Sequence, residues 1–153
     1  MKRVLAVVVV VVLVACRPKA NNDEARVRAE LDVPSDATLI SLHASPDDTG
    51  MQREGLRIVA VFHVKASSAG ALSAPPWSSL PLPASVATFN RPPHELAVPP
   101  VGTYRCEVGV YTTGTSHTMS PCSSTLPAHF DMYRVATFEP STGSLSTLMQ
   151  FYY

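Results

Sequence analysis

The sequence predicts an α+β domain built on an antiparallel sheet of about five strands, with one N-terminal helix and a long proline-rich segment. Two observations support this fold class. Apolar residues alternate with polar ones in five separate stretches, which is the period of a half-buried strand. These stretches are mostly neighbours in the sequence, which favours antiparallel pairing in a single sheet.

The predicted helix comes before the strands. Asn22 or Asp23 can cap its N-terminus, and the acidic groups of Asp23 and Glu24 are favourably placed near its start. The helix is expected to run to about Leu31, because Pro34 disfavours helical geometry in the residue before it.

The five predicted strands cover residues 38–44, 56–65, 103–112, 130–139 and 144–152. The first two are expected to pair antiparallel, with His43 opposite about Arg57 and His63 opposite about Ala37, so that the two histidines face solvent without meeting. The last two strands are joined by residues 140–143, where an early proline and a late glycine are typical of a hairpin turn.

The segment from Pro75 to Pro100 holds eight prolines in 26 residues, so neither a regular helix nor a central strand can run through it. Large apolar residues are interleaved with the prolines, which favours an ordered segment. The functional interpretation is an exposed surface that binds a partner through Trp77, Leu80, Leu82 and Phe89. The alternative is that these side chains cover the core, where most large apolar groups lie.

The first sixteen residues form a distinct pattern. Two cations, Lys2 and Arg3, are followed by twelve uncharged apolar residues and then by Cys16. This is typical of an export signal. Twelve helical residues rise about 18 Å, which is too short for a hydrocarbon core of roughly 30 Å.

Residues 13–16, Leu-Val-Ala-Cys, resemble the lipobox of bacterial lipoproteins. The resemblance implies that a diacylglycerol is attached to the thiol of Cys16 and that the signal, residues 1–15, is cleaved before it. It also implies a membrane location in the cell envelope, and Arg17 in place of aspartate implies the outer membrane, facing the periplasm. The alternative is an ordinary signal peptide with a cysteine near its boundary.

The predicted organisation after cleavage is a lipidated tether over residues 16–22 and one globular domain over residues 23–153. Ten Lys or Arg remain against twelve Asp or Glu, a net charge of −2 without any block of like charge. This charge balance argues against nucleic acid as a partner. The expected partners are the membrane, through the lipid, and an envelope protein or glycan.

Lipidation of Cys16 leaves Cys106 and Cys122 as a pair in an oxidising compartment, and a disulfide between them is predicted. The alternative of two thiols at a metal or redox site lacks the Cys-x-x-Cys spacing.

No sequence signature of a hydrolase, phosphate-binding loop or metal site is present, so we expect no cofactor and no metal, and a non-enzymatic binding or accessory module. The alternative is an envelope hydrolase with a site assembled from scattered acid–base groups. The groups available are His94, Glu95, His117 and His129.

Overall fold

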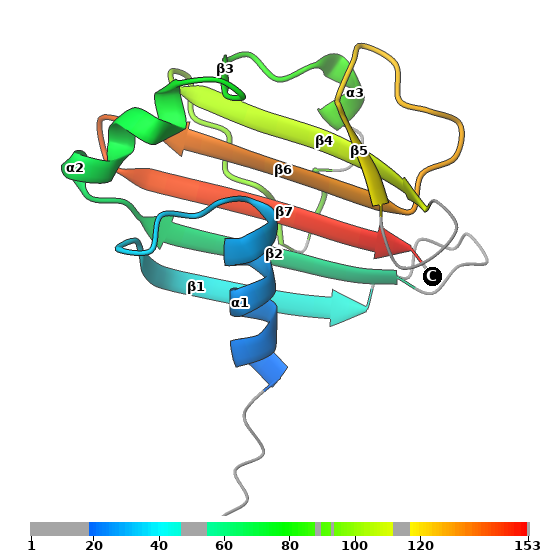
Figure 1. Ribbon diagram of the computed structural model, residues 1–153, viewed down its shortest axis with the longest axis horizontal. Coiled ribbons are helices and arrows are strands. Elements are labelled where there is room, and N and C mark those ends of the chain that lie inside the picture. Colours follow the sequence, from blue (N-terminus) through cyan, green and yellow to red (C-terminus); the bar gives the residue numbers. More distant parts are fainter. Residues whose placement is uncertain (1–18, 47–54, 88–89, 93, 112–116, 153) are drawn as a thin grey trace, which may run out of the picture.

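The computed structural model describes residues 19–46, 55–87, 90–92, 94–111 and 117–152, and these residues form one antiparallel sheet with short helices around it (Figure 1). The helical elements are α1 (Lys19–Glu30), α2 (Ala66–Ala69), the 3-10 turn η1 (Gly70–Ser73) and α3 (Ala84–Ala87). The strands are β1 (Thr38–Pro46), β2 (Gly55–His63), β3 (Ser78–Ser79), β4 (Thr103–Tyr111), β5 (His117–Pro121), β6 (Met132–Glu139) and β7 (Ser144–Tyr152).

The strand order is β1-β2-β7-β6-β4-β3, and β5 also pairs with β4. The predicted antiparallel sheet is therefore confirmed, and each of the five predicted strands is present. The number of elements was wrong, because the described residues contain seven strands and three α-helices. Both additional strands, β3 and β5, pair with the outer side of β4, over two and five residue pairs respectively.

The hairpin between β6 and β7 forms at the predicted turn. Gly143 has a φ of +68°, and its N–H donates to the carbonyl of Glu139 over 2.9 Å. A Cβ at this position would lie 2.6 Å from the carbonyl oxygen of Val64, so a larger residue cannot be placed here without moving the backbone. The glycine is required both for the left-handed conformation of the turn and for the close approach of the turn to the backbone of Val64.

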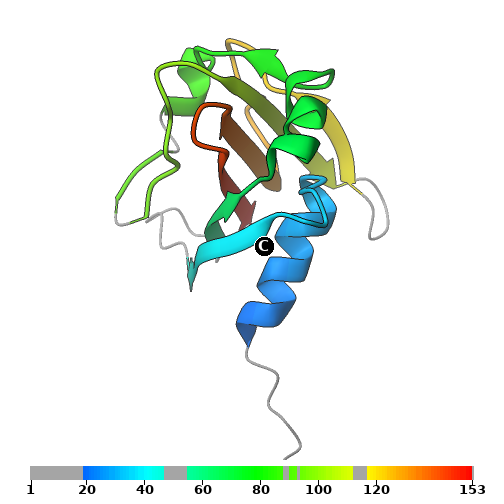
Figure 2. The same ribbon diagram turned by 90° about the vertical axis from the view of Figure 1, so that its left-hand side faces the viewer.

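One face of the sheet, here called the helix face, is covered by α1 (Figures 1 and 2). Val27 and Leu31 are fully buried against Ile58 and Phe62 of β2 and other apolar residues of this face. Burial of a side chain of this size stabilises the fold by about 2 kcal/mol. The helix ends at Glu30, and Asp32, with a φ of +50°, turns the chain out of the helical conformation.

Ion pairs connect the end of α1 to the middle of the sheet. Glu107 Oε2 accepts from Arg105 over 3.0 Å and from Arg134 over 2.8 Å. Arg134 also binds Glu30, and Arg105 binds Asp32, each over 2.6 Å. Burial alone would lower the pKa of Arg105, but the hydrogen bond to Asp32 and the charge of Glu107 outweigh burial and raise it.

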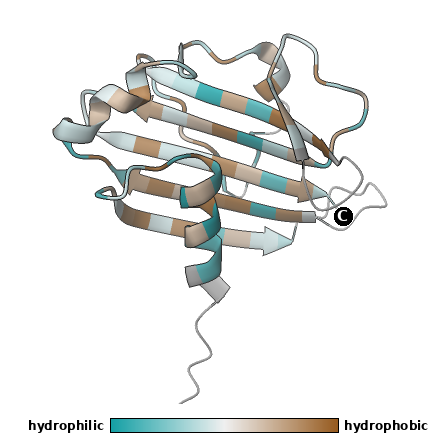
Figure 3. Cartoon of the chain, in the orientation of Figure 1, coloured by the Kyte–Doolittle hydropathy of each residue, from teal (hydrophilic) through white to brown (hydrophobic). Residues whose placement is uncertain are grey.

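The opposite face, here called the proline face, is covered by the proline-rich segment (Figure 2). Val86 and Leu96 of this segment are buried against Val59, Val135 and Leu148 of the sheet. Polar and apolar residues alternate along strands such as β4 (Figure 3), yet both faces of the sheet are covered. Successive residues of a strand therefore point into two different buried layers, one beneath α1 and one beneath the proline-rich segment.

The disulfide between Cys106 and Cys122 is confirmed, with the two Cα atoms 5.3 Å apart. Cys106 lies on the proline face in β4, and Cys122 follows β5 directly. The N–H of Cys122 also donates to the carbonyl of Cys106 over 2.9 Å. The interpretation of these residues as two free thiols does not hold.

Helix α1 begins at Lys19, four residues before the earliest expected helical residue, Asp23. The predicted tether over residues 16–22 therefore overlaps the first turn of the helix. Lipidation of Cys16 and the signal over residues 1–15 lie outside the described residues. Among the helices of the described part of the chain, none has the length and apolar character needed to cross a bilayer.

Candidate functional site

The described residues between 90 and 100, here called the strap, lie across the proline face without regular secondary structure. Proline lacks an N–H, and an irregular chain leaves its carbonyl groups without partners of its own. The sheet supplies the missing partners. Arg57, buried on β2, donates from Nη2 to the carbonyl of Arg91 over 3.2 Å and to that of His94 over 3.0 Å.

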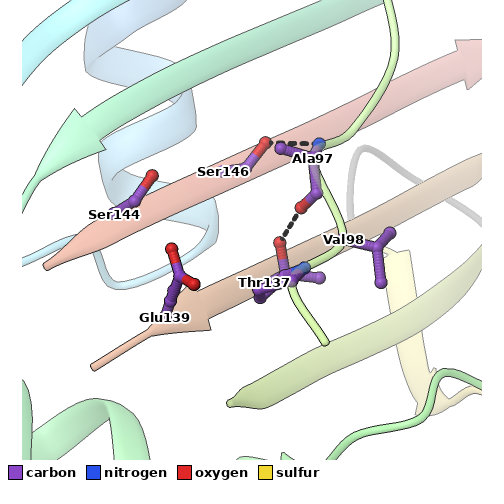
Figure 4. Close-up of a pocket in the computed structure, with 7 residues that line it drawn as sticks. Ala97, Val98, Thr137, Glu139, Ser144 and Ser146 are labelled. Carbon is purple, nitrogen blue, oxygen red and sulfur yellow. Dashed lines mark hydrogen bonds between the residues drawn. The ribbon is translucent and has the colours of Figure 1, made fainter. Parts of the chain in front are cut away.

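Two hydroxyl groups hold the next part of the strap. The N–H of Ala97 donates to Ser146 Oγ over 3.0 Å, and Thr137 Oγ1 donates to the carbonyl of Ala97 (Figure 4). Within the strap, the side-chain amide of Asn90 exchanges two hydrogen bonds with the backbone of Leu96. The strap is thus fixed to three neighbouring strands, β2, β7 and β6.

A pocket of about 150 Å³ opens between the strap and the ends of β6 and β7 (Figure 4). Its lining residues are Ala97, Val98, Pro99, Thr137, Glu139, Ser144 and Ser146. The Thr137 and Ser146 hydroxyls are engaged by the strap, which leaves Glu139 and Ser144 as the polar groups at the open end. Pockets for small-molecule ligands usually measure about 300–1,000 Å³, so this pocket suits a single polar group of a ligand.

The strand register brings a third polar residue beside this pair. His63 of β2 is opposite Ser144 of β7, and Ser144 is opposite Glu139 of β6, so the three share one face of the sheet. In a serine hydrolase the histidine stands between the nucleophile and the acid. Here Ser144 stands in the middle, and Glu139 Oε2 accepts from Thr142 Oγ1 over 2.6 Å. The order does not match a catalytic triad.

The residues predicted to bind a partner have different positions. Trp77 is 9% exposed and packs within the core of the helix face. Leu80 is half-buried, and Leu82 is half-buried against the core of the proline face. Phe89 lies outside the described residues. The described positions agree with the alternative interpretation, cover for the core, and the binding role of these residues stays a prediction.

The acid–base residues predicted for a hydrolase are dispersed over several segments. His94 stacks on His43 of β1, with ring centroids 4.0 Å apart and planes at 7°. Stacked imidazoles present their faces to each other, whereas their nitrogen lone pairs lie in the ring planes, so they do not chelate one ion between them. Glu95 and His129 are exposed, and the side chain of His117 lies outside the described part.

The register of β1 and β2 confirms that His43 and His63 do not meet. His63 is opposite Thr38 at the end of the paired region, and His43 is opposite Val59, not Arg57, near its middle. A bulge at Ile40 shifts the register between Leu39 and Ser41. Across the described ranges, no three His, Cys, Asp or Glu side chains are close enough together to hold a metal ion.

Sequence reasoning missed Glu139 and Ser144. Both flank the predicted hairpin turn, so pairing β6 with β7 through residues 140–143 would have placed them opposite each other. No family model matches the chain, and comparisons with curated proteins and with solved structures give no match either.

Proposed function

We propose that this chain is a bacterial lipoprotein, anchored in the cell envelope through a lipid on Cys16, and that its domain is a non-enzymatic binding or accessory module. The observation that carries the proposal is the lipobox-like sequence at residues 13–16, directly after an apolar run of signal-peptide length. Two or more acyl chains on one residue give stable anchoring, where a single chain gives reversible binding. The proposed location is the outer membrane, facing the periplasm, because residue 17 is arginine.

Three features of the described residues support a binding role over a catalytic one. The pocket is small, and two of its four side-chain polar groups hold the strap. His63, Ser144 and Glu139 are not in the order that acyl transfer requires. His94 is engaged in a ring stack with His43. Nothing in this arrangement favours the hydrolase formed from His94, Glu95, His117 and His129.

The proposed partner is an envelope protein or a glycan, and the proposed contact surface is the outward side of the proline-rich segment. Leu80 and Leu82 are half-buried there and keep part of their surface accessible. Val98 in this segment and Val101, which directly follows it, are 45% and 76% exposed and extend this surface. Apolar groups on a stiff, proline-rich chain lose little conformational entropy when a partner binds, which favours affinity.

The test is crosslinking in intact membranes followed by purification and mass spectrometry. The wild-type protein is compared with Cys16→Ala, which cannot be lipidated, and with Val101→Asp on the proposed surface. Val110→Asp is the matched control, because Val110 is 41% exposed on β4 outside the proline-rich segment.

The proposal predicts one abundant partner that is captured by wild type and by Val110→Asp, and that is lost with Cys16→Ala and Val101→Asp. Capture of the same partner by all four proteins would contradict both the anchor and the surface. If no partner is captured, and the purified protein has a hydrolytic activity that is lost when His94 or His129 is substituted, the binding role is wrong.

A further inference from the structure

Helix α1 crosses the strands of the sheet from one edge toward the other. Its C-terminal end points toward β6 and β4, because the side chain of Glu30 binds Arg134 and that of the following Asp32 binds Arg105. Earlier in the helix, Arg28 lies 4.9 Å from the ring centroid of Phe62 in β2. Helix α1 also contacts β1, and both views show its start projecting beyond the β1 edge (Figures 1 and 2).

Little chain separates this helix from the proposed lipid. Because α1 begins at Lys19, only Arg17 and Pro18 stand between it and Cys16. Three residue steps span at most about 11 Å when fully extended. The lipidated residue is consequently held near the first turn of α1, which lies at the β1 edge and far from β3 and β5.

The β1 edge has the composition of a surface that can rest on lipid. Its nine residues include no Asp, Glu, Lys or Arg, and His43 is its one titratable residue. Ile40 is 63% exposed and sits at the bulge in the strand. Charged side chains are one usual protection of an edge strand that faces water, and this strand has none.

Charge near the proposed anchor in the sequence also fits a phospholipid surface. Arg17 and Lys19 are the cations closest to Cys16 in the sequence. Basic residues close to an anionic bilayer are attracted to it electrostatically. The bulge at Ile40 interrupts regular pairing along the edge, which disfavours addition of a strand from another protein chain.

We propose that the β1 edge is the membrane-facing side of the domain, with Ile40 in contact with the phospholipid headgroup region. The inference rests on the proposed lipid anchor at Cys16. It adds an orientation, because the β1 edge faces the bilayer while β3, β5 and Val101 face away from it. The surface proposed to bind a partner is then held away from the membrane, where a partner can reach it.

The orientation is tested with the full-length lipidated protein in vesicles of phosphatidylcholine and phosphatidylglycerol that contain a lipid with a nitroxide on its headgroup. The nitroxide quenches tryptophan emission at short range. Ile40→Trp reports on the β1 edge. Val101→Trp is the matched control, because both substitutions replace an exposed, branched apolar side chain. Trp77, the one native tryptophan, is present in every protein and gives the common baseline.

The inference predicts that the nitroxide removes most of the emission added by Ile40→Trp and leaves the emission added by Val101→Trp unchanged. Thr38→Trp, on the same strand, provides a second reporter if Ile40→Trp fails to fold, and its emission is expected to be quenched as well. Equal quenching at positions 40 and 101, or quenching at position 101 alone, would overturn the orientation.

Flotation and the intact mass of the protein separate this inference from the proposed function. If the protein carries no acyl chains and does not float with the vesicles, the proposed anchor is wrong, and the orientation is wrong with it. If it carries acyl chains and floats, but the reporters on β1 are not quenched, the orientation is wrong and the anchor stands.

Discussion

The two faces of the sheet are covered by chains of opposite character. On the helix face, α1 satisfies its interior backbone hydrogen bonds within the helix, so it needs from the sheet mainly an apolar surface for Val27 and Leu31. On the proline face, the strap has no such internal ladder. Its carbonyl and N–H groups are satisfied by side chains that the sheet supplies, namely those of Arg57, Thr137 and Ser146.

This difference explains why the proline face carries buried polar residues within its apolar layer. Arg57 is 4% exposed, and it also donates to Gln150 Oε1 over 3.3 Å. A buried charge is costly unless it is fully hydrogen-bonded, so Arg57 and the strap depend on each other. The comparison teaches that a cover without regular secondary structure takes its backbone hydrogen bonds from polar side chains beneath it. Beneath α1, by contrast, the buried cations Arg105 and Arg134 pair with acidic side chains at the end of the helix.

The largest expected effect is on the helix face. Leu31→Ala removes a side chain that is 1% exposed and should lower the free energy of unfolding by about 3.5 kcal/mol, because it loses apolar burial and leaves a cavity. Chemical denaturation measures the change. Val101→Ala, at a position that is 76% exposed, is the control and should change stability by less than about 0.5 kcal/mol. Equal effects of the two substitutions would contradict the assigned core.

The second largest effect on stability is expected from the disulfide between Cys106 and Cys122, at the β4 edge of the proline face. The disulfide joins residues 16 apart, and in the chain-entropy model closing such a loop stabilises the fold by about 3 kcal/mol. Denaturation of Cys106→Ala/Cys122→Ala should therefore show a loss of about that size relative to wild type. A double variant as stable as wild type would mean that β4 and β5 stay together without the bond.

Arg57→Ala should cost about 2.5 kcal/mol, because two strap carbonyls lose their charged donor. Hydrogen exchange should locate the change, with faster exchange at the amides of Leu96 and Ala97 and little change in α1. Arg91→Ala is the control, since its side chain is exposed and its carbonyl remains in place. If hydrogen exchange became equally faster in the strap and in α1, the strap would not depend on Arg57 more than α1 does, and the comparison would be wrong.

The smallest effect depends on pH. Burial of Tyr133 on the proline face raises its pKa well above the ordinary value, although the charge of Arg57 partly opposes this. A pKa that is higher in the folded state gives a contribution that is fully present below about pH 10, the unfolded value, and lost as the pH rises further. The stability of wild type should thus fall more steeply above pH 10 than that of Tyr133→Phe. Parallel stability curves would contradict this assignment.

The strands, the hairpin at residues 140–143 and the disulfide could be predicted because each depends on local pattern or on a simple pairing of residue types. Helix α1 was predicted to begin too late, since Lys19 to Asn22 are polar and carry no apolar period. The strands β3 and β5 were missed, because they are short and form by pairing with β4. Their existence is decided by tertiary contacts.

The candidate site was harder to predict for the same reason. Alternation along β2 puts Arg57 on the face opposite Ile58, but its burial depends on where the strap lies, which no periodicity encodes. The stack of His43 on His94 joins residues far apart in the sequence. For Trp77 the apolar character indicated burial as cover for the core, with binding as the second interpretation, and the side chain is buried.

The central claim, that this domain is held to a membrane through Cys16, is tested most directly by the mass of the mature protein. The protein is extracted from the membranes of bacteria that process lipoproteins, and its N-terminal peptide is measured by mass spectrometry. We predict a peptide that begins at Cys16 and carries a diacylglycerol on the thiol. A peptide that begins elsewhere, or that begins at Cys16 with a free thiol, would contradict the account.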